Sequence, residues 1–173
     1  MDALIEQIKS DKEKSIIIAT MNQQQESEVN LALEAEILNN KMLRDFDSKH
    51  QGNLEELAVK KLEDIQGDER DVVIVSTVYG PDADGKITQM FGDINRANGH
   101  RRLNVLFTRA KHKIILVTSL RSSNIKESKR EGPQILKKYL EYAEKGEITD
   151  LDRRTSGSTE NPFEESIREA LTN

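Results

Sequence analysis

Short β-branched runs that alternate with segments of helical spacing predict an α/β fold built on a mostly parallel sheet. Three apolar runs rich in Val and Ile occupy 15–20, 72–78 and 114–118, and a weaker fourth occupies 57–62. Continuous runs of this kind are typical of strands that are covered on both faces. Because parallel strands need crossover connections, we expect the helical segments to form layers on the sheet.

Four segments have apolar residues at a helical spacing, which predicts four helices before, between and after the strands. The second of them extends over about 23–41. The positions that carry the four patterns are Leu4, Ile5 and Ile8; Leu31, Ala35 and Leu38; Leu103, Leu106 and Ala110; and Ile135, Leu136, Tyr139, Leu140 and Ala143.

The composition excludes several classes of protein. The 173 residues contain no Cys, which excludes a disulfide scaffold, thiol catalysis and Cys-ligated zinc, and which suits the cytoplasm. The net charge of -5 argues against a general basic nucleic-acid binder, although local basic faces remain open. No apolar run reaches the ~18–20 residues of a membrane span, so no membrane partner is expected. His50, His100 and His112 lack metal-ligand spacing; we expect surface positions and no metal site.

Two polar regions interrupt the alternating pattern. Residues 80–99 are rich in Gly, Asn and Asp and predict a long, turn-rich inserted loop. A second polar stretch precedes Asn161 and Pro162, which have the pattern of a helix N-cap and first helical residue. We therefore expect a domain over 1–150, a linker over 151–160, and the start of a further, truncated domain over 161–173.

Residues 80–86 match the G-x-x-x-x-G-K spacing of a phosphate-binding loop, but their chemistry argues against that function. Pro81 lacks an N–H, Asp82 and Asp84 would oppose phosphate, and Ile87 stands where a magnesium-binding hydroxyl belongs. A tight turn explains these residues better.

Two other segments combine polar and basic residues in patterns that suit chemistry. In 62–76, a turn with Gln66, Gly67 and Glu69 leads into an apolar run. In 101–111, Arg102 and Arg109 lie seven residues apart, which would place them on one helix face. From spacing alone, a surface turn and a solvated basic helix are favoured over a chemical function for these segments.

These segments resemble motifs V and VI of superfamily 1 helicases, which have approximate patterns D-x-x-Q-G-x-E-x-D-x-V-I and R-L-N-V-A-L-T-R-A-K. Residues 16–25 are similar to motif IV of the same family. The residues that match motifs V and VI are Gln66, Gly67, Glu69, Asp71, Val73, Ile74, Arg102, Leu103, Asn104, Val105, Thr108, Arg109, Ala110 and Lys111.

The resemblance implies the C-terminal, second RecA-like domain of a helicase, a lobe with a three-layer fold that closes over ATP. It implies that Arg109 is the catalytic arginine finger and that Glu69 binds the ribose. Gln66 and Gly67 would form the turn between the nucleotide and the nucleic acid. Further nucleotide-binding candidates are Gln25 and Arg102. ATP and Mg²⁺ would be held mainly by a first lobe that this sequence lacks.

The same resemblance suggests contacts with single-stranded nucleic acid, with DNA as the expected form. Thr20, Asn22 and Ser76 are candidates for these contacts, although each could equally be a polar residue that satisfies a strand end. Lys61 stands where motif V commonly has a Thr, and Gln25 is followed by Glu26 where motif IV often has an Arg.

The sequence has no credible phosphate-binding loop, so we expect no ATP hydrolysis by this chain alone. The alternative is a non-catalytic RecA-like module that binds a partner or nucleic acid. The 80–99 insert and the segment 161–167 are similar to helicases in which a nuclease-like domain follows the helicase core.

Overall fold

The computed structural model describes residues 1–77 and 79–145. The chain divides into two compact units. Among the described residues, the first consists of Met1–Ile87 and Val105–Ser119, and the second of Thr88–Asn104 and 120–145. The predicted linker over 151–160 and the predicted domain start over 161–173 lie outside the described residues. Within the described part of the chain, no helix is both long and apolar enough to span a membrane.

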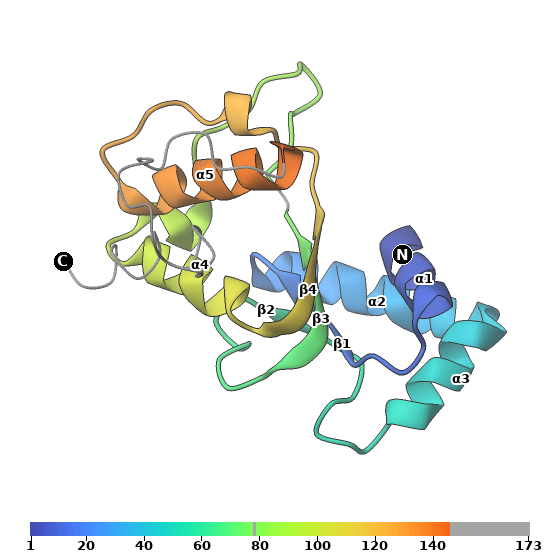
Figure 1. Cartoon of the computed structure of the whole chain (residues 1–173). Coiled ribbons are helices and arrows are strands. Elements are labelled where there is room, and N and C mark those ends of the chain that lie inside the picture. The colour runs from blue at the N-terminus through green and yellow to red at the C-terminus, as the bar shows by residue number, and fades with distance from the viewer. Residues whose placement is uncertain (78, 146–173) are drawn as a thin grey trace. The chain divides into compact units, whose positions relative to one another are not determined.

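The first unit contains a four-stranded sheet in which every strand is parallel to its neighbours, with the order β2-β1-β3-β4 (Figure 1). Its strands are β1 (Ile16–Thr20), β2 (Ala58–Lys61), β3 (Arg70–Ser76) and β4 (Ala110–Val117). This arrangement confirms the predicted α/β, RecA-like fold class. All five residues of β1 are buried, as expected for a strand covered on both faces.

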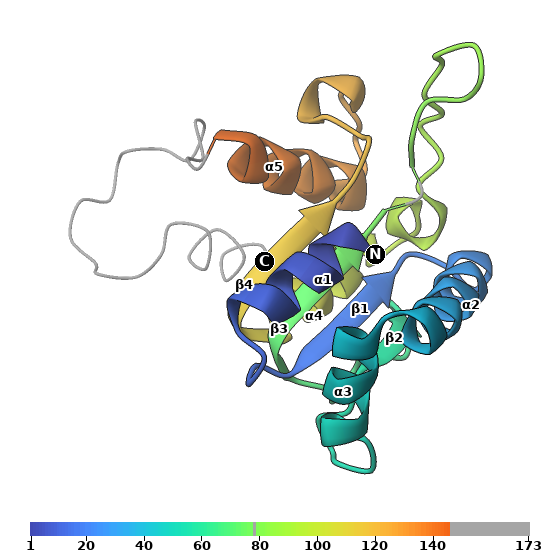
Figure 2. The same cartoon turned by 90° about the vertical axis from the view of Figure 1, so that its right-hand side faces the viewer.

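Three helices cover one face of this sheet: α1 (Asp2–Ser10), α2 (Gln23–Asn39) and α3 (Lys41–His50) (Figure 2). Alternate residues of the strands face the same side, so one set of strand residues meets all three helices. The buried residues of this core are Leu4, Ile8, Ile16, Ile18, Leu33, Leu43, Phe46, Val59, Val72 and Ile74.

The predicted apolar face of α2 is wrong, although the helix itself is confirmed. Leu31 and Leu38 are 67% and 73% exposed, and Ala35 is also exposed. The helix buries its opposite side, where apolar residues recur every four positions at Val29, Leu33 and Ile37. Because α2 has apolar residues on two sides, periodicity alone did not distinguish the side that contacts the sheet.

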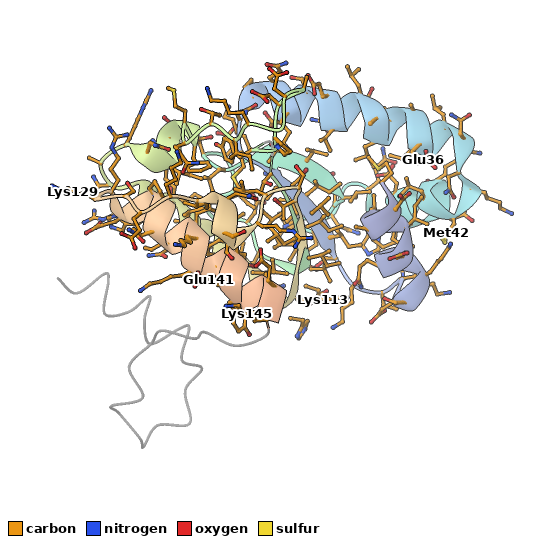
Figure 3. The ribbon with its side chains drawn as sticks, turned by 90° about the horizontal axis from the view of Figure 1, so that it is seen from above. Glu36, Met42, Lys113, Lys129, Glu141 and Lys145 are labelled. Carbon is orange, nitrogen blue, oxygen red and sulfur yellow. The ribbon has the colours of Figure 1, made fainter. Side chains whose placement is uncertain are left out.

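The sequence reasoning missed α3 as a separate helix. Asn40 ends α2 and caps α3: its side-chain oxygen accepts hydrogen bonds from the N–H groups of Met42 and Leu43, at 3.1 and 3.4 Å. Figure 3 labels Glu36 near the end of α2 and Met42 in α3. The new helix direction brings Leu43 and Phe46 into the core.

The second unit contains the 3-10 helices η1 (Gly92–Asn95) and η2 (Ser122–Asn124), helix α5 (Glu131–Lys145) and the first six residues of α4 (Gly99–Phe107). Of the predicted face of α5, Leu136, Tyr139 and Leu140 are buried and Ile135 is half-buried, but Ala143 is exposed. The expectation of a surface position for His100 is wrong, because this side chain is buried and its Nδ1 lies 2.7 Å from Glu131 Oε2.

Asp71 joins the starts of β1 and β3. Its Oδ2 accepts hydrogen bonds from the N–H and hydroxyl of Ser15, at 2.9 and 3.1 Å. The Ser15 hydroxyl in turn accepts one from the Asp71 N–H, at 3.0 Å. Partial burial raises the pKa of the Asp71 carboxyl, but the hydrogen bonds from Ser15, with Lys14 and His112 nearby, outweigh it, and the net pKa is lowered.

The substitution Asp71→Asn should lower the free energy of unfolding by about 1–2 kcal/mol at neutral pH, because it removes the charge from a shared hydrogen-bond network. The folded-state pKa is below the ordinary value of 3.8. This contribution is therefore present above that pH and is lost as the pH falls below it. Urea titrations of both proteins at several pH values check this, and an equal difference at pH 7 and pH 2.5 would contradict it.

Ile94 in η1 lies directly against two glycines of the second unit. A Cβ at Gly99 or at Gly132 would lie 2.0 Å from the Ile94 carbonyl oxygen. We therefore expect Gly132→Ala to destabilise the second unit by about 1–3 kcal/mol or more, because the backbone at Ile94 must move to make room for the added methyl group. Hydrogen exchange of the α5 amides measures this loss directly. Lys138→Ala, at an exposed position of the same helix, serves as the control and should leave protection unchanged.

Candidate functional site

The parallel register places the candidate site residues of the first unit at two opposite edges of the sheet. Thr20 pairs with Lys61 on one side and with Ser76 on the other, so these three residues share the carboxyl edge. Arg70 pairs with Ala110 at the amino edge. Since a strand rises about 3.3 Å per residue, the seven residues of β3 separate the two edges by roughly 20 Å.

Gln25 holds the carboxyl edge together. Its Oε1 accepts a hydrogen bond from the Met21 N–H, and its Nε2 donates to Ser76 Oγ, both at 2.9 Å. The side chain is buried, so it links the ends of β1 and β3. The structure thus places Gln25 beside the predicted nucleic-acid residues and away from the amino edge, where Glu69 and Arg109 lie.

The other candidates at the carboxyl edge differ in accessibility. Thr20 is only 1% exposed and donates weakly to the carbonyls of Asn22 and Lys60. Asn22 is exposed, and its Oδ1 caps α2 by accepting from the Gln25 N–H at 2.9 Å. Its amide nitrogen therefore remains on an accessible face of the edge.

Lys61 belongs to a polar network at the same edge. Its ammonium group lies 2.9 Å from Asp64 Oδ2 and donates to Gln23 Oε1 at 2.7 Å. The hydrogen bond to Asp64 raises the pKa of Lys61 above its ordinary value, and the Coulombic effect of nearby Glu26 acts in the same direction. Lys61 is therefore a cation within an acidic network.

The turn before β3 brings a second set of candidates to the amino edge. Gln66, Gly67 and Glu69 are all exposed, and Gly67 has a φ of 92°, in a region that favours glycine. This positive φ lets the chain reverse direction between Ile65, which is fully buried, and the start of β3. The Glu69 carboxylate is therefore held at a strand end and open to solvent.

The sequence reasoning missed Arg70, which the structure shows to be a buried structural residue. Only 3% of it is exposed, and its guanidinium donates to the carbonyls of Glu56 and Glu69 and lies 3.6 Å from Asp68 Oδ1. It fixes the backbone on which Glu69 stands. The sequence did carry a signal for this role, because Arg70 lies between the acidic residues Glu69 and Asp71.

Arg109 lies next to this turn, because its carbonyl accepts a hydrogen bond from the Arg70 N–H at 3.1 Å. Its guanidinium donates from Nε to the Val105 carbonyl at 3.0 Å and from Nη2 to Thr108 Oγ1 at 3.1 Å. Both acceptors are neutral. Among the described residues, Arg109 forms no ion pair, so its charge is held in place without compensation by an acid.

The prediction that Arg102 and Arg109 share one helix face is wrong. Helix α4 ends at Phe107, and Arg109 lies beyond it with its side chain on a carbonyl of the last helical turn. Ala110, expected in the same helix, is the first residue of β4. Arg102 belongs to the second unit, where its Nη1 lies 2.6 Å from Asp93 Oδ2.

Lys111 lies two residues after Arg109 and, unlike Arg109, forms an ion pair, with Glu55. Its ammonium group donates to Glu55, which raises the pKa of Lys111, and Asp71 and Glu69 add to the effect. The first cation after Arg109 is therefore already compensated. Arg109 is the residue of this segment that suits an added anion.

The 80–86 loop is a closed turn, as its chemistry predicted. Asp82 Oδ1 accepts from the N–H groups of Asp84 and Lys86, at 3.0 and 2.8 Å. The N–H groups of Asp82 and Gly85 are also used within the turn, on the carbonyls of Lys86 and Asp82. These donors are the groups that a phosphate-binding loop would present to phosphate, and a carboxylate already takes two of them.

The described residues contain no group of three or more His, Cys, Asp or Glu side chains placed to hold a metal ion. The candidate site thus consists of an uncompensated guanidinium and an exposed carboxylate on neighbouring segments of the amino edge, and a polar row at the carboxyl edge. Such a site can contact the anionic part and the hydroxyl groups of a nucleotide.

Comparisons with known proteins fit this fold. The AAA domain family matches residues 1–121, a range that includes all four strands. The chain is 32% identical over 139 residues to the "Uncharacterized ATP-dependent helicase MG140" of Mycoplasma genitalium and to its homolog from Mycoplasma pneumoniae. Each match takes in 78% of this chain and 12% of the relative, so the chain spans only a small part of these relatives' length. From the extent of the family match, the chain belongs to the AAA domain family.

Proposed function

We propose that this chain is the second RecA-like lobe of an ATP-dependent superfamily 1 helicase, which completes the ATP site with Arg109 and binds single-stranded nucleic acid. The observation that carries the proposal is the uncompensated Arg109 guanidinium, held by two neutral acceptors in the segment that pairs with the start of β3. The two curated relatives are themselves described as ATP-dependent helicases, which supports the same activity.

The geometry of Arg109 suits an arginine finger. Two of its donors are occupied by Val105 and Thr108, which orient the guanidinium plane and leave other N–H donors of the fork for an anion. When the terminal phosphoryl group transfers to water, negative charge spreads over its oxygens, and a fixed cation stabilises that charge. A charge already paired with a carboxylate would do this poorly.

The remaining parts of the ATP site would come from elsewhere. Glu69 would accept hydrogen bonds from the ribose hydroxyls, because its carboxylate is exposed at the same edge of the sheet as Arg109. Magnesium and the phosphate-binding loop belong to the first lobe in this proposal, in accord with the closed turn at 80–86. ATP and Mg²⁺ are therefore cofactors of the protein that contains both lobes.

Nucleic acid would lie along the carboxyl edge. The exposed amide of Asn22 suits phosphate oxygens, and Lys61 would reach a phosphate by exchanging its ion pair with Asp64 for it. Gln25 and Thr20 are buried, so their part in this proposal is to hold the ends of β1, β2 and β3 in register.

Arg109→Ala in the protein that carries both lobes should lower kcat of the nucleic-acid-stimulated ATPase by about 10³–10⁵-fold, since an arginine finger acts mainly on the transition state. Arg109→Lys should recover only part of this loss, because Lys lacks the planar fork. The KM for ATP should change much less than kcat. Steady-state phosphate release under saturating oligonucleotide measures both constants.

Arg96→Ala is a matched control, because Arg96 is also an arginine, is exposed, and pairs with Asp93 at 2.9 Å. Its turnover should stay within about twofold of wild type, as expected for loss of a surface ion pair. Turnover by Arg109→Ala equal to that of this control would overturn the finger assignment and favour a non-catalytic RecA-like module.

The 173-residue chain alone should show no ATPase activity above background, because its only loop with phosphate-loop spacing already uses its N–H donors. For the same reason, Lys86→Ala should not change turnover in the two-lobed protein. Phosphate release by the purified chain, with and without a dT oligonucleotide, tests this. Hydrolysis that disappears in Lys86→Ala would show that the loop binds ATP after all.

A further inference from the structure

The two units carry opposite net charges. Over the described residues, the second unit has ten Lys and Arg side chains against five Asp and Glu, whereas the first has thirteen against nineteen. The chain's overall charge of -5 therefore conceals a unit with a clear excess of positive charge. An excess of this kind in a small unit indicates a surface for an anionic partner.

The excess is concentrated in residues 121–130, here named the basic loop. It contains four cations and one acid, Glu127, and each of these five side chains is exposed. The cations are Arg121, Lys126, Lys129 and Arg130. Figure 3 shows the Lys129 side chain pointing outward from the loop before α5.

The cations of the basic loop are not compensated, unlike many in the first unit. None of the four forms an ion pair with any described residue. In the first unit, ion pairs with nearby carboxylates hold Lys49, Lys60, Lys61, Arg70 and Lys111. What distinguishes the basic loop is its local charge balance, with four unpaired cations and a single acid within ten residues of a chain that has more acids than bases.

Three polar side chains hold the backbone of the basic loop by hydrogen bonds. Glu144 in α5 accepts from the N–H and the hydroxyl of Ser122, at 2.8 and 2.9 Å. Gln89 donates to the Asn124 carbonyl and accepts from the Lys126 N–H, at 3.0 and 2.9 Å. Gln134 donates to the Ser128 carbonyl at 2.6 Å. The backbone that carries these cations is therefore already ordered, so less conformational entropy is lost when a ligand binds.

We propose that the basic loop binds the phosphate backbone of single-stranded nucleic acid, as a contact separate from the polar row at the carboxyl edge. The inference rests on the proposed function for the identity of the polyanion. The loop has four exposed cations but no aromatic residue on which a base could stack. The contact is therefore electrostatic and independent of base sequence.

The test is binding of a fluorescent dT oligonucleotide to the 173-residue chain, measured by anisotropy over a range of salt concentrations. The triple variant K126A/K129A/R130A should reduce the slope of log K against log salt by about 2, because each lost phosphate contact on a single strand removes ~0.7. The double variant K126R/K129R keeps the charges and should retain the wild-type slope. Thermal unfolding should be the same for all three proteins, since the substituted side chains are exposed.

The matched control K9A/K12A/K41A removes the same charge from exposed, unpaired positions of the first unit, and its slope should remain that of wild type. An equal loss in both triple variants would overturn the inference and indicate a net-charge effect only. A wild-type slope in K126A/K129A/R130A, or no binding by the wild-type chain, would also overturn it. The proposed function is decided separately, by the Arg109 ATPase measurement.

Discussion

The parallel pairing of β1 with β3 is the constraint on which the first unit depends. Ile17 and Val73 are both fully buried and adjacent in register, so neither strand can carry a polar side chain at its centre. Polar chemistry is therefore possible only where the strands begin or end. The Asp71–Ser15 network stabilises the amino end of this pair, and the Gln25–Ser76 hydrogen bond stabilises the carboxyl end.

Arg109 connects this constraint to the proposed chemistry. Its side chain binds a carbonyl of the last turn of α4, and its own carbonyl binds the Arg70 N–H at the start of β3. The same residue therefore ends a helix, begins a strand pairing and presents a cation. A guanidinium fixed in this way needs little reorganisation when an anion approaches, which is the property that electrostatic catalysis requires.

Sequence reasoning recovered the strands because β-branched runs such as 72–78 are distinctive in a polar chain. It misplaced the buried face of α2, since Leu31 and Leu33 give opposite sides of one helix comparable apolar character. It also extended α4 through Arg109, because no Gly or Pro marks the helix end there. The end is set by the hydrogen bond from Arg109 to the Val105 carbonyl and by pairing with β3, and the pairing depends on residues distant in sequence.

The separation of the candidates into two edges could not be predicted either, because it follows from strand order and register. Under the proposed function, this separation means that ATP and nucleic acid would contact opposite ends of the same strands. A single strand, β3, connects the Glu69 turn at one edge to Ser76 at the other, and its neighbours hold it by hydrogen bonds along its length. Densely packed interiors deform little, so a force applied to Arg109 by ATP would move the carboxyl edge as one body. The first unit would thus transmit nucleotide binding to nucleic acid by rigid displacement.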